Sequence, residues 1–186
     1  MQEKYSENEG LELVNCVGAG KVSVEIDLRK LSEDLPSETM SFATGGIFFK
    51  LEEDSPTIRI SRLGSYYITG ASSEKELIET KLDILKILTD FEIISESTDR
   101  SFSVINMVFT YDLCKDIDLN SLVLSLGFEN IEYEPEQFPG LVYRPSGFSY
   151  VALIFSSGKL TITGGNNRKE AVKVTNHLNE VISSST

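Results

Sequence analysis

The chain has 186 residues, 40% of them hydrophobic, and its 29 acidic and 17 basic residues give a formal net charge of −12. This length and hydrophobic content predict one domain of ordinary size or two small ones, and they exclude a disordered acidic tail. The acidic excess by itself argues against a nucleic-acid partner, because phosphate groups favour a basic surface.

The N-terminal segment and the two cysteines predict an intracellular chain. The segment MQEKYSENEG is polar and acidic, so we expect no secretory signal, and the sequence has no run of 18 apolar residues that predicts a membrane span. Cys16 and Cys114 are too few for a disulfide framework and lack metal-ligand spacing, so we expect free thiols in a reducing cytosol, and no cofactor or metal.

The first half of the chain predicts strands closed by one long helix. After a flexible segment over 1–12, alternating apolar residues and turn signals predict strands at 13–17, 47–51, 57–61 and 66–69, with a short acidic helix near 27–34. An apolar stripe predicts a helix over 74–88, and Ser73 and Glu76 have the spacing of a capping box.

The second half repeats this order of elements. It predicts strands at 104–109, 130–134, 141–144, 150–155 and 159–163, a short helix near 118–124 and a long helix over 168–182. Asn167 and Glu170 have the spacing of a variant capping box. His177 lies on the flank of the last apolar stripe, where we expect a surface residue without a function.

The two halves are copies of one pattern of about ninety residues. A shift of 94 residues carries Gly64 to Gly158 and Thr69-Gly70 to Thr163-Gly164. The stretch from Val14 to Val17 also matches Ile105–Val108, at a shift of 91 residues. Two copies indicate a pseudo-symmetric domain with repeats over 13–94 and 102–183.

The stretch from Tyr150 to Thr163 predicts a sheet with no charge on either face. Ala152 and Ile154 point to one side, whereas Val151, Leu153 and Phe155 point to the other. Two long helices are enough to cover one side of about ten strands, so the other side stays open or meets something else. It could bind a ligand or a partner, be buried in a homodimer, or close into a barrel.

Two stretches of the second half carry a resemblance to a known family. YEPEQFPGLVYR (Tyr133–Arg144) and LIFSSGKLTITG (Leu153–Gly164) resemble the second repeat of the TATA-box-binding protein family very closely, and INMV (Ile105–Val108) is similar to the opening strand of that repeat. The resemblance is close over 104–182 and holds only in outline over 14–88. The compact acidic chain looks more archaeal than eukaryotic.

The resemblance implies an α+β fold in which two repeats form one curved antiparallel sheet, a saddle with helices on its convex face. It also implies that the concave face binds the minor groove of double-stranded, A·T-rich promoter DNA, with Asn15 and Asn106 donating from NH₂ groups and Arg144 and Lys159 meeting phosphates. The DNA-binding residues implied in this way are Asn15, Val17, Thr57, Thr69, Asn106, Val108, Phe138, Arg144, Val151, Leu153, Phe155, Lys159, Thr161 and Thr163. An uncharged floor reconciles such binding with the net charge, although the remaining repulsion favours high salt or a cationic partner.

The resemblance also implies that Phe138 and Phe155 are the paired phenylalanines that the family wedges into a base step. The first repeat has Ser61 at the position of Phe155, Arg59 at that of Leu153 and Tyr67 at that of Thr161. The position that corresponds to Phe138 falls on Thr44, or on Phe42 if the Thr-Gly-Gly stretch of the first repeat contains a two-residue insertion. Arg59 either enters a narrow minor groove or reflects drift in a paralogue, and the sequence leaves both open.

The loop before Phe138 implies a protein partner. Glu134 and Glu136 match the family's loop that docks transcription factor B, and acidic side chains suit a basic partner. The resemblance therefore implies a DNA-binding general transcription initiation factor in the archaeal cytosol, associated with the nucleoid. The alternative is a regulatory paralogue that engages DNA weakly and acts through its partner. An enzyme is disfavoured because the sequence has no nucleophile motif or metal-ligand cluster, and a homodimer through the concave face is possible when the chain is free.

Overall fold

The structure is a computed structural model that describes residues 10–35, 40–43, 45–95 and 101–184. The chain forms two compact units, and each is described by itself: the first unit is Asn15–Asn106, and the second unit is Met1–Val14 with Met107–Thr186. The strands Glu12–Lys21 and Ser103–Asp112 each contribute residues to both units. The repeat boundaries at 13–94 and 102–183 therefore remain a prediction.

The first unit contains antiparallel strands and two helices. The strands are β1 (Glu12–Lys21), β2 (Ser41–Ala43), β3 (Gly46–Phe49), β4 (Thr57–Ser61) and β5 (Ser65–Ala71), and the helices are α1 (Leu28–Asp34) and α2 (Glu74–Asp90). The strands lie in the order β2-β3-β4-β5-β1, and each strand is antiparallel to its neighbour.

The second unit has the same plan. Its strands are β6 (Ser103–Asp112), β7 (Ile131–Glu132), β8 (Gly140–Tyr143), β9 (Val151–Phe155) and β10 (Lys159–Gly165). Its helices are α3 (Leu119–Leu126), the short 3₁₀ helix η1 (Phe128–Asn130) and α4 (Arg168–Ser184). The strand order is β6-β10-β9-β8-β7. Read from β1, the first unit has the matching order β1-β5-β4-β3-β2.

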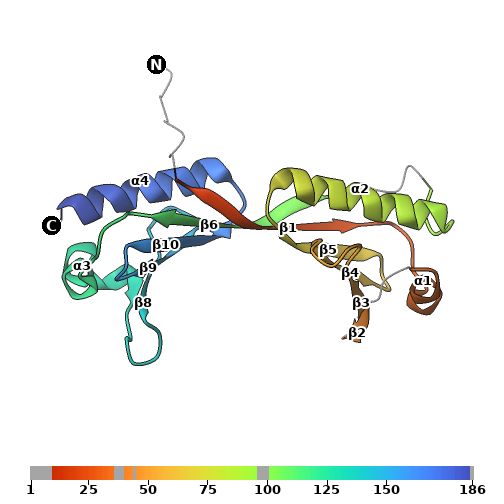
Figure 1. The fold of residues 1–186 in the computed structure, drawn as a ribbon, viewed down its shortest axis with the longest axis horizontal. Coiled ribbons are helices and arrows are strands. Elements are labelled where there is room, and N and C mark those ends of the chain that lie inside the picture. Colours follow the sequence, from red (N-terminus) through yellow and green to blue (C-terminus); the bar gives the residue numbers. More distant parts are fainter. Residues whose placement is uncertain (1–9, 36–39, 44, 96–100, 185–186) are drawn as a thin grey trace, which may run out of the picture. The chain divides into compact units, whose positions relative to one another are not determined.

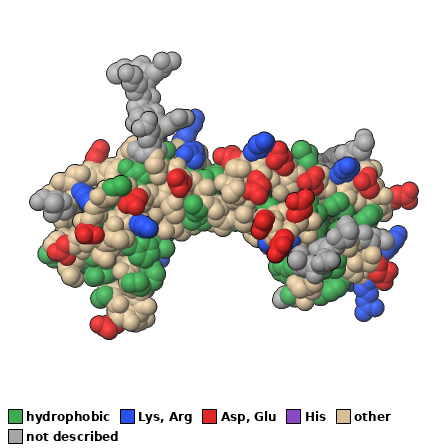
Figure 2. All heavy atoms as spheres, viewed as in Figure 1, with side chains coloured by type: hydrophobic (Ala, Val, Ile, Leu, Met, Phe, Trp, Pro, Cys, Tyr) green, Lys and Arg blue, Asp and Glu red, His purple; other side chains and the backbone are tan. Residues whose placement is uncertain are grey.

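One face of each sheet packs against helices and forms the core. On β4 the side chains of Ile58 and Ile60 are almost fully buried, whereas Thr57, Arg59 and Ser61 between them are half-buried. The same alternation occurs on β9, and α2 and α4 each run along one face of the strands of their own unit (Figure 1). Charged side chains are spread over the helix-bearing part of each unit (Figure 2). Among the described residues, no helix covers the opposite face.

The helix caps differ in detail from the predicted capping boxes. The Ser73 hydroxyl accepts a hydrogen bond from the Glu76 N–H at 3.1 Å, as predicted. The Glu76 carboxylate, however, accepts from the N–H and the hydroxyl of Ser72, both at 2.7 Å, and not from Ser73. At α4 the Glu170 carboxylate accepts from the Ser149 N–H. Glu76 thus binds the residue directly before its N-cap, whereas Glu170 joins α4 to the segment that precedes β9.

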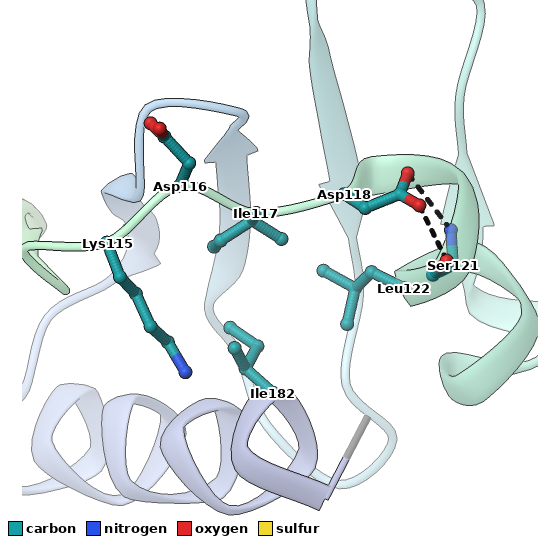
Figure 3. A pocket seen from close by; sticks show the side chains of 7 residues that line it. All are labelled: Lys115, Asp116, Ile117, Asp118, Ser121, Leu122 and Ile182. Atoms are coloured by element: carbon teal, nitrogen blue, oxygen red, sulfur yellow. Dashed lines mark hydrogen bonds between the residues drawn. The ribbon is translucent and has the colours of Figure 1, made fainter. Parts of the chain in front are cut away.

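The helix α3 is capped by Asp118, and the cap borders a small hollow (Figure 3). The Asp118 carboxylate accepts from the Asn120 N–H at 3.0 Å and from the Ser121 hydroxyl at 2.6 Å. These hydrogen bonds, chiefly that from Ser121, lower the pKa of Asp118. Leu122 and Ile182 line the hollow from α3 and α4, so the cap fixes the start of a helix that packs on the core.

The predicted elements agree closely with the structure, and the short elements β2 and η1 are the two omissions. Each of the nine predicted strands and four predicted helices overlaps an observed one. No described helix is both long enough and apolar enough to cross a membrane.

Candidate nucleic-acid interface

The second unit presents an uncharged strand surface on the side away from its helices. Val151, Leu153 and Phe155 are half-buried, whereas Ala152 and Ile154 between them are fully buried. Leu153 pairs with Thr161 of β10 on one side and with Val142 of β8 on the other. Thr163 continues this face along β10. We call this surface the floor of the second unit. It can press against a shallow apolar or hydrogen-bonding partner.

Two phenylalanines stand together at the end of this floor. The rings of Phe138 and Phe155 have centroids 5.8 Å apart and an interplanar angle of 66°, which is an edge-to-face contact. Gly140 pairs with Phe155, and a Cβ at Gly140 would lie 2.8 Å from the Phe138 ring and 3.0 Å from the Phe155 ring. The glycine therefore leaves the space that the two rings occupy. Phe138 remains 37% exposed.

The predicted phosphate contacts have different surroundings. Arg144 forms an ion pair with Glu132 at 3.2 Å, and both side chains are more than half exposed. An exposed pair of this kind is weak, so Arg144 can exchange Glu132 for a phosphate at little cost. Lys159 is exposed and lines a hollow together with Phe155 and Cys114.

The two asparagines lie on the strands where the floors begin. Asn15 of β1 and Asn106 of β6 are half-buried, as are Val17 and Val108, which follow them two residues later. The Asn15 side-chain oxygen accepts from the Gly70 N–H at 3.0 Å. This bond fixes the orientation of the amide and leaves its NH₂ group for other acceptors.

The cross-strand pairs of the first unit match those of the second unit at the shift of 94 residues that the sequence predicted. Gly46 pairs with Ser61 as Gly140 pairs with Phe155, and Arg59 pairs with Tyr67 as Leu153 pairs with Thr161. Thr57 pairs with Thr69 at the position of Val151 and Thr163. The Ser61 hydroxyl accepts from the Ser65 N–H at 3.2 Å, so this serine supports the β4–β5 turn where the second unit carries a ring.

The first unit also holds a residue that the sequence analysis missed. Phe48 of β3 lies beside Arg59, whose guanidinium is 5.6 Å from the Phe48 ring centroid and 5.7 Å from that of Tyr67. These three side chains, with Thr57 and Thr69, line a shallow hollow. The floor of the first unit is therefore aromatic and cationic. Successive side chains of a strand point to opposite faces, so Phe48, which lies between Ile47 and Phe49 on β3, could have been predicted on the helix-free face.

The second wedge position of the first unit is only partly described. Phe42 of β2 pairs with Ile47 and is 58% exposed, so it is available as a contact. It lies four residues before Gly46, whereas Phe138 lies two residues before Gly140. The other candidate, Thr44, lies outside the described residues.

The predicted partner loop projects between β7 and β8. Glu134 and Glu136 are both exposed, and the Glu134 carbonyl accepts from the N–H groups of Gln137 and Phe138 at 2.9 and 3.0 Å. The Glu134 carboxylate also accepts from the Gln137 side-chain amide. The loop therefore orders one carboxylate and leaves the other in solvent, directly before Phe138.

His177 is not the surface residue that the sequence predicted. Its Nε2 lies 3.0 Å from the Tyr143 hydroxyl, and its ring stacks on Tyr143 and Phe148. Burial raises the pKa of Tyr143. The half-buried histidine therefore joins α4 to Tyr143 of β8 and to Phe148 in the loop after β8. Within the described part of the chain, no three His, Cys, Asp or Glu side chains lie close enough to hold a metal ion.

Comparison with known proteins identifies relatives along nearly the whole chain. Residues 10–91 and 101–185 match the family model described as transcription factor TFIID, or TATA-binding protein (TBP). TATA-box-binding protein C of Halobacterium salinarum is 41% identical over 164 residues, which are 87% of this chain and 91% of that protein. The TATA-box-binding protein of Archaeoglobus fulgidus is 35% identical over 91% of this chain and 93% of its own length.

A solved structure confirms the predicted fold class. The TBP of Methanococcus jannaschii has a TM-score of 0.83 and is 32% identical, with 94% of this chain and 99% of that chain covered. Its similarity extends through both units, and so confirms an α+β fold built from antiparallel repeats with helices on one face. The contacts assigned to individual floor residues remain predictions.

Proposed function

Because the chain belongs to the TATA-binding protein family, we propose that it binds an A·T-rich promoter element in the minor groove, bends it and recruits transcription factor B. Members of this family are transcription factors and not enzymes. The observation that carries the proposal is the uncharged, half-buried floor of the second unit, which ends at the Phe138–Phe155 pair.

The floor suits the chemistry of an A·T-rich minor groove. Such a groove offers acceptor atoms and lacks the guanine amino group, so small apolar and hydroxyl side chains can approach its base edges closely. Val151, Leu153 and Thr161 supply that surface in the second unit, and the NH₂ group of Asn15 supplies a donor in the first unit. Binding then depends on buried apolar area more than on charge, which is how a chain with a net charge of −12 can hold DNA.

The phenylalanine pair supplies the bend. Unstacking a base step costs a few kcal/mol, and the cost is offset by the larger contact that a bent duplex permits. Phe138 and Phe155 brace each other edge to face, so one ring holds the other in place for insertion. The family's bending mechanism thus has its side chains in the second unit.

A regulatory paralogue is the second candidate function, and the first unit favours it. Ser61 stands where the second unit has Phe155, and a hydroxymethyl group cannot fill a base step. The acidic loop at Glu134 and Glu136 nevertheless matches the family's partner loop. A chain of this kind would act through transcription factor B more than through DNA bending.

A gel-shift titration on an A·T-rich duplex, with and without transcription factor B, separates the two candidates. The general factor binds the duplex alone, whereas the paralogue shifts it only when the partner is present. A Glu134→Gln/Glu136→Gln variant is expected to retain DNA binding and to weaken the complex with the partner, because both carboxylates are exposed and suit a basic partner surface. Absence of any shifted complex contradicts the proposed function.

The DNA-free chain could form a homodimer through the same surface. Without DNA, the floor of the second unit is an uncharged surface that a second copy of the chain could bury. Sedimentation of the free protein tests this proposal, since added A·T-rich duplex should dissociate such a dimer. A promoter-binding factor of this kind would work in the cytosol, on the nucleoid.

A further inference from the structure

The row Phe48–Arg59–Tyr67 crosses three adjacent strands of the first unit on its helix-free face. Arg59 pairs with Phe48 of β3 and with Tyr67 of β5, and both rings lie within 5.7 Å of its guanidinium carbon. Thr57 and Thr69 complete a hollow of about 280 Å³ around this row. The matching row of the second unit is Val142, Leu153 and Thr161, which carries no charge and no ring.

The guanidinium of this row is held in place. The guanidinium carbon of Arg59 lies 5.6 Å from the Phe48 ring centroid and 5.7 Å from that of Tyr67, so it is flanked by a ring on each neighbouring strand. Two aromatic walls favour a cation between them and restrict the rotamers of Arg59. The positive charge of Arg59 is therefore held at a defined position on the floor.

We propose that Phe48, Arg59 and Tyr67 form a specificity-determining element that takes a narrow, A-tract minor groove and thereby sets the orientation of the chain on DNA. The inference rests on the proposed function and concerns how the chain distinguishes the two halves of the promoter DNA. A narrow A-tract groove has an enhanced negative potential that attracts an inserted arginine. The Phe138–Phe155 pair requires the opposite, a flexible pyrimidine–purine step that opens.

The two units consequently prefer different half-sites. A duplex with a TA-step half and an A-tract half places the TA step under the second unit and the A-tract under the first. Here the choice arises from one cation and two rings, before any partner protein is added.

The exposed thiol of Cys114 allows a direct test of orientation. Cys114 lines a hollow with Phe155 and Lys159, close to the wedge pair, so a thiol-tethered chemical nuclease at this residue marks the position of the second unit. Cys16 is fully buried, and burial raises the pKa of its thiol to about 11, so it does not compete for the reagent. The probe is a duplex with one TA-step half and one A-tract half, together with the same duplex reversed.

We expect cleavage at the TA-step end to exceed cleavage at the A-tract end by about tenfold, the worth of one good groove contact. The preference should follow the sequence when the duplex is reversed. Arg59→Leu, which installs the residue of the matching position, should bring the ratio close to one. Arg29→Leu removes the same charge from the exposed surface of α1 and should leave the ratio unchanged.

Several results overturn the inference. They are equal cleavage at both ends, cleavage mainly at the A-tract end, or an Arg59→Leu variant that keeps the original ratio. If Arg59→Leu fails to fold, Tyr67→Thr removes one aromatic wall and is expected to lower the ratio as well. Loss of binding to every duplex contradicts the proposed function itself, whereas binding without an orientation contradicts only this inference.

Discussion

Replacing Phe138 by alanine tests the wedge at its most exposed ring. Phe138 is 37% exposed and touches Phe155 edge to face, so the substitution removes a surface that DNA can bury and leaves the sheet intact. Loss of the aromatic contact and of the buried part of the ring costs the fold about 3 kcal/mol, which lowers the melting temperature by about 10 °C and leaves a folded protein at room temperature. The variant should therefore fold and can be assayed for DNA binding.

The effect on binding follows from the exposed area. If a phenylalanine can bury about 200 Å², the 37% that is free corresponds to about 75 Å². At about 25 cal/mol per Å², insertion of this surface between bases is worth about 2 kcal/mol, or about 25-fold in affinity. The bend should decrease together with the affinity, because the base step is no longer held open.

Energy transfer between dyes at the two ends of a short A·T-rich duplex measures both quantities. The wild-type chain should shorten the distance between the ends, and Phe138→Ala should restore most of it. Phe128→Ala is the matched control, since Phe128 is 71% exposed but lies on η1, away from the floor. A folded Phe138→Ala variant with unchanged bend and affinity would refute the wedge argument.

Three further predictions concern the first unit and the helix caps. Ser61→Phe should increase the bend in the same energy-transfer assay, despite losing the bond from the Ser65 N–H, and an unchanged distance would show that a ring at this position does not act as a wedge. Asn15→Asp keeps an acceptor for the Gly70 N–H but replaces the NH₂ donor by a negative charge, so gel shifts should show at least about tenfold weaker binding; undiminished affinity would remove Asn15 from the interface. Hydrogen bonds from Ser72 lower the pKa of Glu76, and hydrogen bonds from Ser121 lower the pKa of Asp118. The stability that these two carboxylates contribute is therefore complete above the ordinary carboxyl pKa of about 4, and it is lost as the pH falls through their lower pKa values in the folded state. Melting temperatures measured from pH 7 to pH 2 should fall in that acidic window, less steeply in Glu76→Gln, and equal slopes for both proteins would contradict the assignment.

The sequence predicts the strands and helices well because the repeat and the alternation are local patterns. The half-buried series Val151, Leu153 and Phe155 follows from parity alone, and the pairing registers of the two units agree with the shift between the repeats. The strand β2 was missed because it is three residues long and all three side chains are exposed. A short edge strand without an apolar face has no periodic signal.

The side-chain arrangement in the first unit could not be predicted from local patterns. Arg59 was expected on the floor, but its place between Phe48 and Tyr67 depends on which strands pair and in what register. His177 was expected at the surface because its contacts with Tyr143 and Phe148 come from residues about thirty positions away. Glu76 and Glu170 also bind partners other than the predicted ones, since cap spacing does not specify which donor lies nearest in space.

The central claim is that the helix-free floors of the two units meet DNA from the minor groove, and base substitution tests it most directly. Inosine·cytosine pairs keep the minor-groove pattern of A·T pairs, because inosine lacks the guanine amino group, but they change the major groove. We predict equal affinity for an A·T element and its inosine·cytosine counterpart, and at least about tenfold weaker binding to the G·C counterpart. Binding in which inosine·cytosine behaves like G·C would contradict the account.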